Sequence, residues 1–184
     1  MTREFIDFVK EHLHDDTSRL LLSAARYPSI DMAAAVQQIE GRRMCHEKWP
    51  SLEPYDEFLY PPRLNREQSS SEATAEHKAE TIFKLCGDTA PLSVADLTGG
   101  MGIDSIAFAR RQQSSHHPEF HVDYVERDPI LCSLMEHNRN VLGLDNLAVH
   151  CGDSMEWLAT HHHFDIIYID PARRSASGQK VAAF

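Results

Sequence analysis

The chain lacks several features that would mark a secreted, disulfide-bonded or membrane-spanning protein. Its four cysteines stand far apart, with no C-x-x-C pair, at Cys45, Cys86, Cys132 and Cys151. This spacing argues against a disulfide framework and a zinc knuckle, so we expect reduced thiols and a cytoplasmic location. No stretch approaches the roughly 18 apolar residues of a membrane span, and the N-terminus has no apolar signal-peptide core. We therefore expect neither secretion nor membrane insertion.

Positive charge is also scarce. The 184 residues include 18 Lys and Arg against 28 Asp and Glu, which gives a formal net charge of -10. A general attraction to nucleic acid is therefore not built into the whole chain, although a local basic patch is compatible with this composition. Three consecutive histidines at 161–163 fall in an expected loop. Because adjacent residues cannot all face one ion, we expect no native metal site there.

The first 43 residues show helical periodicity in their apolar positions, which predicts three short helices. Each helix has one apolar stripe, so the three must pack against one another or against a neighbouring unit. The expected N-caps are Thr2, Asp16 and either Ser29 or Asp31, and the expected breaks lie near Pro28 and Gly41.

Residues 49–62 combine four prolines with six large apolar side chains. Prolines interrupt a helix, but a solvated linker would not need the apolar groups, so we expect an ordered strap lying on a surface. We assign residues 1–65 to a helical N-terminal domain that includes this Pro-rich strap. Serines at 69–71 then precede an alanine-rich helix that ends near Cys86 and Gly87.

From residue 91 onward, short apolar strands alternate with helices. The expected strands cover 92–97, 120–126, 147–151 and 164–170, and the helices begin near Ile103, Pro129 and Asp153. Such alternation indicates right-handed βαβ units and a parallel sheet with helices on both faces. We assign residues 66–184 to this α/β domain, an incomplete sheet of about four strands.

The segment from Asp96 to Asp104 carries the strongest chemical signal. Gly99, Gly100 and Gly102 lie in a strand-to-helix turn, where the absence of Cβ atoms lets the backbone approach a ligand. Their spacing departs from the G-x-G-x-x-G of dinucleotide-binding proteins. The carboxylate of Asp96 would repel a pyrophosphate but can accept a hydrogen bond from an ammonium group or a water. These features favour a zwitterionic sulfonium ligand such as S-adenosylmethionine over NAD.

Acidic residues end or directly follow all four expected strands, at Asp96, Glu126, Asp153 and Asp170. Ligands of open α/β sheets bind at the carboxyl ends of the strands. Glu126 can accept hydrogen bonds from both hydroxyls of a ribose, and Asp153 can accept one from the adenine amine. The alternatives are an ordinary strand-end charge for Glu126 and a helix N-cap for Asp153.

These residues resemble the class I S-adenosylmethionine-dependent methyltransferases, whose fold is Rossmann-like. More narrowly, they resemble bacterial proteins that join such a domain to a C-terminal THUMP-like domain. The similarity runs from about Gly41 through Tyr60-Pro61-Pro62 to Asp170, and it implies that residues 69–77 line the methionine end of the cofactor. The implied cofactor-binding residues are Asp96, Thr98, Gly99, Gly100, Gly102, Asp104, Glu126 and Asp153, and the implied catalytic residues are Asp170 and Pro171.

The catalytic motif departs from that of amino-directed methyltransferases. Asp170 and Pro171 precede Ala172 and Arg173, where those enzymes carry a second proline and an aromatic residue that stacks on the target base. Asp170 can still accept a hydrogen bond from a target amine, and the carbonyl of Pro171 can accept the second. Arg173 and Arg174 are then candidates to hold a phosphate, which suits an RNA substrate.

The chain ends shortly after its fourth strand, whereas class I methyltransferases have seven. The fourth strand would then be an exposed apolar edge. We therefore expect either that the chain is a piece of a longer protein or that a partner or a second copy covers this edge. For the chain by itself we expect self-association. Our hypothesis is methyl transfer from S-adenosylmethionine to RNA. The alternatives are a noncatalytic nucleotide-binding or protein-interaction module and a nicotinamide-dependent oxidoreductase.

Overall fold

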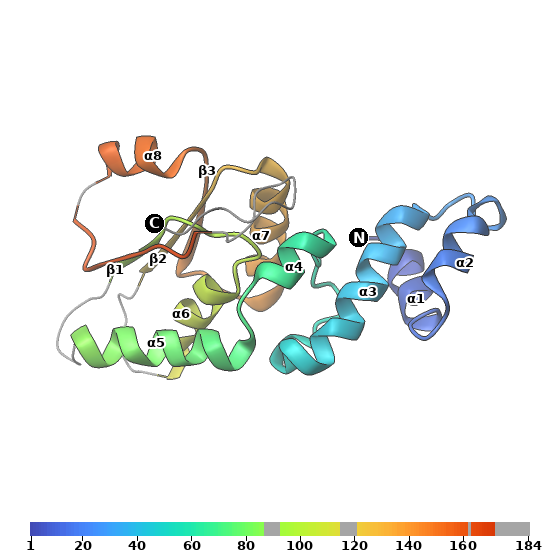
Figure 1. Cartoon of the computed structure of the whole chain (residues 1–184), viewed down its shortest axis with the longest axis horizontal. Helices are drawn as coiled ribbons and strands as arrows, with labels where there is room; N and C mark the ends of the chain where they lie inside the picture. Colours follow the sequence, from blue (N-terminus) through green and yellow to red (C-terminus); the bar gives the residue numbers. More distant parts are fainter. Residues whose placement is uncertain (87–92, 115–120, 162, 172–184) are drawn as a thin grey trace.

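A helical segment and an α/β unit lie side by side along the long axis of the molecule (Figure 1). The computed structural model describes residues 1–86, 93–114, 121–161 and 163–171. Its helical segment contains α1 (Arg3–Glu11), α2 (Thr17–Leu22), the 3-10 turn η1 (Ala24–Arg26) and α3 (Met32–Lys48). Three predicted caps are present, because side chains of Thr2, Asp16 and Asp31 accept hydrogen bonds from backbone N–H groups in the first turns.

Helix α3 continues through Gly41, so the prediction of a break there is wrong. A Cβ atom at Gly41 would lie 2.3 Å from Cβ of Tyr60. The glycine therefore lets the Tyr60 side chain pack directly against the helix backbone. Buried residues on both sides of it, Ile39 and Cys45 among them, belong to the same continuous helix. Gly41 thus serves close packing rather than helix termination.

The strap at residues 49–62 contributes to the core instead of lying on a surface. It begins with the 3-10 turn η2 (Pro50–Leu52) and leads into α4 (Arg63–Gln68), a short helix that the sequence did not predict. The side chain of Asn138 in α7 (Pro129–Leu142) exchanges two hydrogen bonds of 2.8 Å with the backbone of Leu59. Four strap side chains are buried in one core cluster with residues of the sheet, namely Trp49, Leu52, Phe58 and Tyr60.

Four parallel strands form the sheet, as the alternating sequence pattern predicted. They are β1 (Ser93–Asp96), β2 (His121–Glu126), β3 (Leu147–Cys151) and β4 (Ile166–Tyr168), in the order β3-β2-β1-β4. The other helices of this unit are α5 (Glu72–Cys86), α6 (Ile103–Ser114) and α8 (Ser154–Thr160). At the carboxyl end of β1, Asp96 pairs with Tyr124 of β2 and with Tyr168 of β4.

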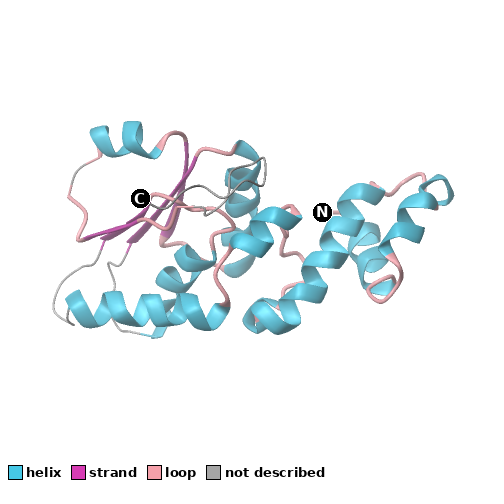
Figure 2. Ribbon diagram, in the orientation of Figure 1, coloured by secondary structure: helices cyan, strands magenta, loops and turns pink. Residues whose placement is uncertain are grey.

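Helices cover both faces of this sheet (Figure 2). Val94, Val122 and Tyr124 pack into the cluster that includes side chains of α5, α6 and α7. Ala95 and Val125 alternate with them along the strands and pack against side chains of α8. The chain winds outward from β1 to β3 and then crosses back to β4, which makes the sheet doubly wound, with a topological switch point between β1 and β4.

Strand β4 lies at one edge of the described sheet, as the sequence predicted. On it and just after it, Ile167 and Ile169 are 49% and 57% exposed. Their face is the one that α8 covers only in part, because Ile167 pairs with Ala95 of that face. An apolar edge strand therefore lies open within the described part of the chain.

Three chemical features of the fold bear on the expectations from the sequence. The four cysteines carry free thiols, of which Cys45 and Cys132 are buried. Within the described ranges, no group of three or more His, Cys, Asp or Glu side chains is arranged to hold a metal ion. Nor does any described helix have the length and apolar character to cross a membrane.

Candidate cofactor-binding and catalytic site

The predicted site residues lie around the switch point between β1 and β4. The loop after β1 connects to both neighbouring strands: the backbone N–H of Gly100 donates to Glu126 Oε2 at 2.9 Å, and that of Asp170 donates to Thr98 Oγ1 at 2.7 Å. The structure thus brings the glycine loop, the end of β2 and the residue after β4 into one place. This is the position where doubly wound sheets bind their ligands.

The glycines of this loop are required by its geometry. Gly100 and Gly102 have φ values of +56° and +85°, a region that favours glycine. A Cβ atom at Gly99 would lie 2.3 Å from the ring of Tyr124, and one at Gly102 would lie 2.6 Å from the sulfur of Met135. The loop therefore lies directly on the side chains of β2 and α7, at an approach that only glycine allows.

Asp96 anchors this loop from below. Its side chain is 1% exposed. Oδ1 accepts a hydrogen bond from the Thr98 backbone N–H at 3.1 Å, and Oδ2 accepts one from the Ser105 hydroxyl at 2.6 Å. Burial raises the pKa of the Asp96 carboxyl to about 6, although these hydrogen bonds oppose the shift. Both oxygens thus hold protein groups, which gives Asp96 a role in shaping the loop.

Glu126 presents a partly exposed carboxylate beside the glycine loop. Each of its oxygens accepts one backbone hydrogen bond, Oε2 from Gly100 at 2.9 Å and Oε1 from Asp128 at 3.0 Å. Because a carboxylate offers about four acceptor positions, one further donor fits at each oxygen. The geometry suits two neighbouring hydroxyl groups of a ligand.

Asp153 is the N-cap of α8. Its Oδ1 accepts hydrogen bonds from the backbone N–H groups of Met155 and Glu156, which is the alternative that the sequence left open. Asp153 is also exposed, two residues beyond Cys151, which pairs with Glu126 at the end of β3. Two large apolar side chains near these acids were not predicted as site residues: Ile130 is 62% exposed and Met155 is 68% exposed.

Asp104 and Asp170 share a basic partner that sequence reasoning missed. The ammonium group of Lys78 lies 3.1 Å from Asp104 Oδ2 and 3.0 Å from Asp170 Oδ2. It also donates to Ser70 Oγ at 2.9 Å and to the Tyr168 hydroxyl at 2.5 Å. Burial alone would lower the pKa of Lys78, but its bonds to Tyr168, Asp170 and Asp104 outweigh that effect and raise it.

A signal for Lys78 was present in the sequence. Ala75, Ala79 and Ile82 form the buried stripe of α5, and Lys78 lies at helical spacing on the same stripe. A lysine at such a position needs partners for its charge, because an unpaired buried ammonium is strongly unfavourable. Its partners, which lie 26 and 92 residues away in the chain, were not predictable from that spacing.

The catalytic motif is only partly described. The side chain of Asp170 is 51% exposed, and Pro171 next to it is also exposed. Arg173 and Arg174, the predicted substrate-binding residues, lie outside the described residues. Asp104 is more enclosed, and its Oδ1 is buried without a hydrogen-bond partner among the described groups.

The charges around the switch point are predominantly negative. Asp104 and Asp170 contact the ammonium of Lys78. Asp96 and Glu126 accept hydrogen bonds from the loop after β1 and from the start of α6. Such a cluster favours a ligand that carries positive charge, and it disfavours a pyrophosphate. The glycine backbone and the Glu126 carboxylate add places for hydroxyl and amine donors.

Comparison with solved structures shows the fold of the chain. No family model and no curated protein matches the chain. Among solved structures, the "putative methyltransferase from Porphyromonas gingivalis W83" superposes with a TM-score of 0.72 and 30% sequence identity over 93% of this chain. The chain spans 40% of the length of that protein.

Two other solved structures are more distant. A SAM-dependent methyltransferase from Agrobacterium tumefaciens matches 60% of this chain and 34% of its own, with 21% identity and a TM-score of 0.41. A protein-L-isoaspartate O-methyltransferase matches 84% of this chain and 47% of its own, with 18% identity and a TM-score of 0.46. This chain has a Rossmann-like fold, with a four-stranded parallel sheet and helices on both faces. The likeness to the structure from Porphyromonas gingivalis W83 shows that methyltransferase structures share this fold.

Proposed function

We propose that this chain is the cofactor-binding part of an S-adenosylmethionine-dependent methyltransferase. One observation carries the proposal: a glycine loop, Glu126 and Asp170 meet at the switch point through hydrogen bonds from Gly100 and to Thr98. The likeness to the "putative methyltransferase from Porphyromonas gingivalis W83" supports the same function. The excess of carboxylates there suits the positive sulfonium of this cofactor.

The described residues fit the two ends of such a cofactor. The carboxylate of Glu126 would hold the ribose hydroxyls, and the exposed side chains of Ile130 and Met155 would contact the faces of the adenine ring. Asp153 would accept from the adenine amine with the oxygen that does not cap α8. The glycine loop, with Asp96 beneath it, would lie against the methionine portion.

The bound cofactor would supply a methyl group on a sulfonium, which needs no covalent intermediate with the protein. The role of the protein would then be to place the acceptor atom in line with that methyl group. Asp170 would accept a hydrogen bond from a target amine, and the carbonyl of Pro171 would accept the second. This orients the nitrogen lone pair toward the methyl group.

As substrate class we propose RNA, with a base amine as the acceptor and Arg173 and Arg174 as phosphate contacts. The RNA assignment rests on the resemblance to bacterial methyltransferases that carry a THUMP-like domain. We propose these proteins as the narrower family of the chain, and we propose a cytoplasmic location. Methylation of total RNA by a longer protein that contains this chain is the expected activity. Unchanged RNA after incubation with that protein and labelled cofactor would contradict the RNA assignment.

Calorimetric titration of the chain with S-adenosylhomocysteine tests the cofactor assignment, with NADH as the control ligand. We expect micromolar binding of S-adenosylhomocysteine and none of NADH. Glu126→Gln removes the charge and leaves one side-chain oxygen for the two backbone N–H groups of Gly100 and Asp128, so it should weaken binding by about tenfold. Glu156→Gln, an exposed change on α8, is the matched control. NADH binding without competition by S-adenosylhomocysteine would favour the oxidoreductase alternative.

A further inference from the structure

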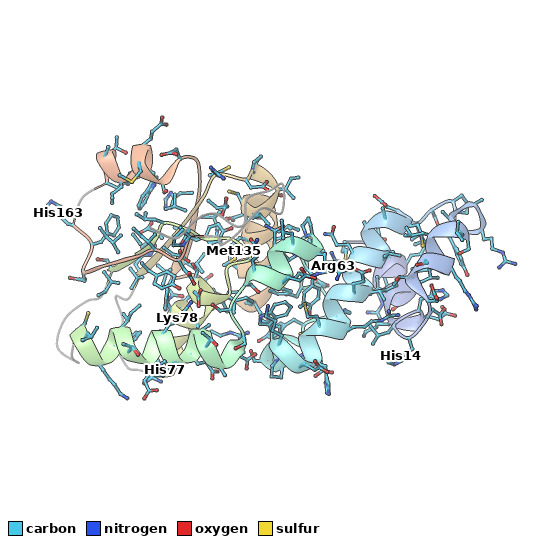
Figure 3. All side chains as sticks on the ribbon, in the orientation of Figure 1. His14, Arg63, His77, Lys78, Met135 and His163 are labelled. Carbon is cyan, nitrogen blue, oxygen red and sulfur yellow. The ribbon has the colours of Figure 1, made fainter. Side chains whose placement is uncertain are left out.

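Lys78 joins three separate segments of the chain at one point. Its ammonium lies within hydrogen-bond distance of four oxygens, although it has three N–H donors. Ser70 precedes α5, Asp104 lies in the first turn of α6, and Tyr168 and Asp170 belong to β4 and the residues after it. Figure 3 shows Lys78 on the side of α5 that faces the sheet and His77 on the opposite side.

The same cluster fixes the proposed catalytic carboxylate. Oδ2 of Asp170 accepts a hydrogen bond from Lys78. The Tyr168 hydroxyl, whose one hydrogen is shared between Asp104 and Asp170, lies 3.3 Å from the same oxygen. The backbone N–H of Asp170 is bonded to Thr98. The carboxylate is therefore held at both its backbone and its side chain, although half of its side-chain surface is exposed.

Lys78 also balances charge that would otherwise be concentrated there. Asp104 Oδ2 accepts from Ser70, Lys78 and Tyr168 at 3.0 to 3.1 Å. Without the ammonium, the carboxylates of Asp104 and Asp170 would share these hydroxyl donors with no cation between them. Charges so close together interact strongly, because the site is partly shielded from solvent.

We propose that Lys78 is a positioning residue, which holds Asp104 and Asp170 in place and sets the charge at the methyl-transfer end of the site. This inference rests on the proposed function, because Asp170 must lie beside the sulfonium. It adds Lys78, which lies just beyond the segment 69–77 that the resemblance placed at the methionine end of the cofactor. Lys78 would act through the two carboxylates that its ammonium contacts.

The charge difference between two ligands provides the test. S-adenosylmethionine carries a positive sulfonium where S-adenosylhomocysteine has a neutral thioether, so the ratio of their dissociation constants reports the local charge. Lys78→Met removes one positive charge from the cluster. We expect the variant to favour S-adenosylmethionine over S-adenosylhomocysteine by about threefold more than the unchanged chain does. Calorimetry of both ligands measures this ratio.

Two further variants make the result specific. Lys78→Arg retains the charge and should retain the original ratio, and so should Lys84→Met, a change on the same helix at an exposed lysine that pairs with Glu80. If Lys78→Met does not fold, Lys78→Gln removes the charge while keeping a hydrogen-bond donor. The ratio of the two dissociation constants in Lys78→Gln then tests the proposal in the same way.

The possible failures are distinguishable. If Lys78→Met weakens both ligands by one factor, or changes neither, Lys78 does not set the charge at the sulfonium and the inference is overturned. If the unchanged chain binds neither ligand, the proposed function fails first.

Discussion

Asp96 combines complete burial with a negative charge at neutral pH. In the folded chain its pKa is about 6, and its ordinary value is 3.8. Between these two pH values the folded protein binds a proton that the unfolded chain does not, so the free energy of unfolding falls as the pH rises from about 4 to about 6. The shift of roughly two pKa units corresponds to about 3 kcal/mol that is present at low pH and lost above it. The loop geometry that Asp96 fixes therefore carries a cost in stability.

Asp96→Asn should remove that pH dependence. The amide can still accept from the Thr98 N–H and can donate to the Ser105 hydroxyl, so both contacts persist without a buried charge. We expect the variant to be more stable than the unchanged chain by about 1–3 kcal/mol at pH 7.5 and by much less at pH 4. Urea unfolding at both pH values measures the difference. Asp145→Asn, at an exposed loop position, is the control and should have the same stability as the unchanged chain at both pH values. If the unfolding free energy of Asp96→Asn changes between pH 4 and pH 7.5 as much as that of the unchanged chain, the prediction is contradicted.

The candidate residues differ in how far the sequence could reveal them. The acids at 96, 126 and 170 were predictable because parallel strands end at one edge of a sheet, and the glycines because the turn between strand and helix recurs in such folds. Ser70 lies within the segment 69–77 that the resemblance placed at the methionine end of the cofactor, whereas Lys78 lies just outside that segment. The contacts of Ser70 and Lys78 with Asp104 were not predictable, because Asp104 lies 34 and 26 residues away in the chain.

At the scale of elements, the sequence predicted the bounds of a helix or strand correctly where residues at its ends determine them. Helix α7 begins at Pro129, as predicted, and its C-cap Gly143 has a φ of +65°. Strand β3 has its predicted bounds, 147–151. The continuation of α3 past Gly41 and the helix α4 were missed, because they depend on the Tyr60 ring and on the buried Arg66, whose guanidinium bonds Glu40 at 2.8 Å. Such contacts leave no periodic pattern.

The open edge at β4 should make the chain associate with itself. Ile167 and Ile169 are large exposed apolar groups beside unpaired backbone of the described sheet. We expect concentration-dependent association in sedimentation velocity, and Ile167→Lys should shift the chain toward the monomer. Leu22→Lys, which removes an even more exposed leucine on α2, should leave the association unchanged. A monomer of the unchanged chain at high concentration would contradict this prediction.

At the scale of the whole molecule, the strap connects the helical segment with the site. Trp49 directly follows α3, is fully buried, and donates from its indole Nε1 to the carbonyl of Ser70 at 2.8 Å. The hydroxyl of Ser70 in turn contacts Asp104 and Lys78. A continuous series of hydrogen bonds thus runs from the end of α3 to the proposed catalytic carboxylate, across the boundary at residue 65 that the sequence suggested.

Trp49→Phe should disturb the site from this distance. The phenyl ring still fills most of the buried space, but the Ser70 carbonyl loses its donor, which should lower the free energy of unfolding by about 1–3 kcal/mol and weaken S-adenosylhomocysteine binding severalfold. Trp157→Phe is a matched control, because the Trp157 Nε1 is buried without a partner among the described groups. Loss of that N–H should leave binding unchanged and stability equal or higher. Calorimetry measures the binding of S-adenosylhomocysteine to the two variants, and urea unfolding measures their stability. If Trp49→Phe and Trp157→Phe have equal effects, the loss of ring volume explains them, and the bond from Trp49 to Ser70 does not connect the helical segment to the site.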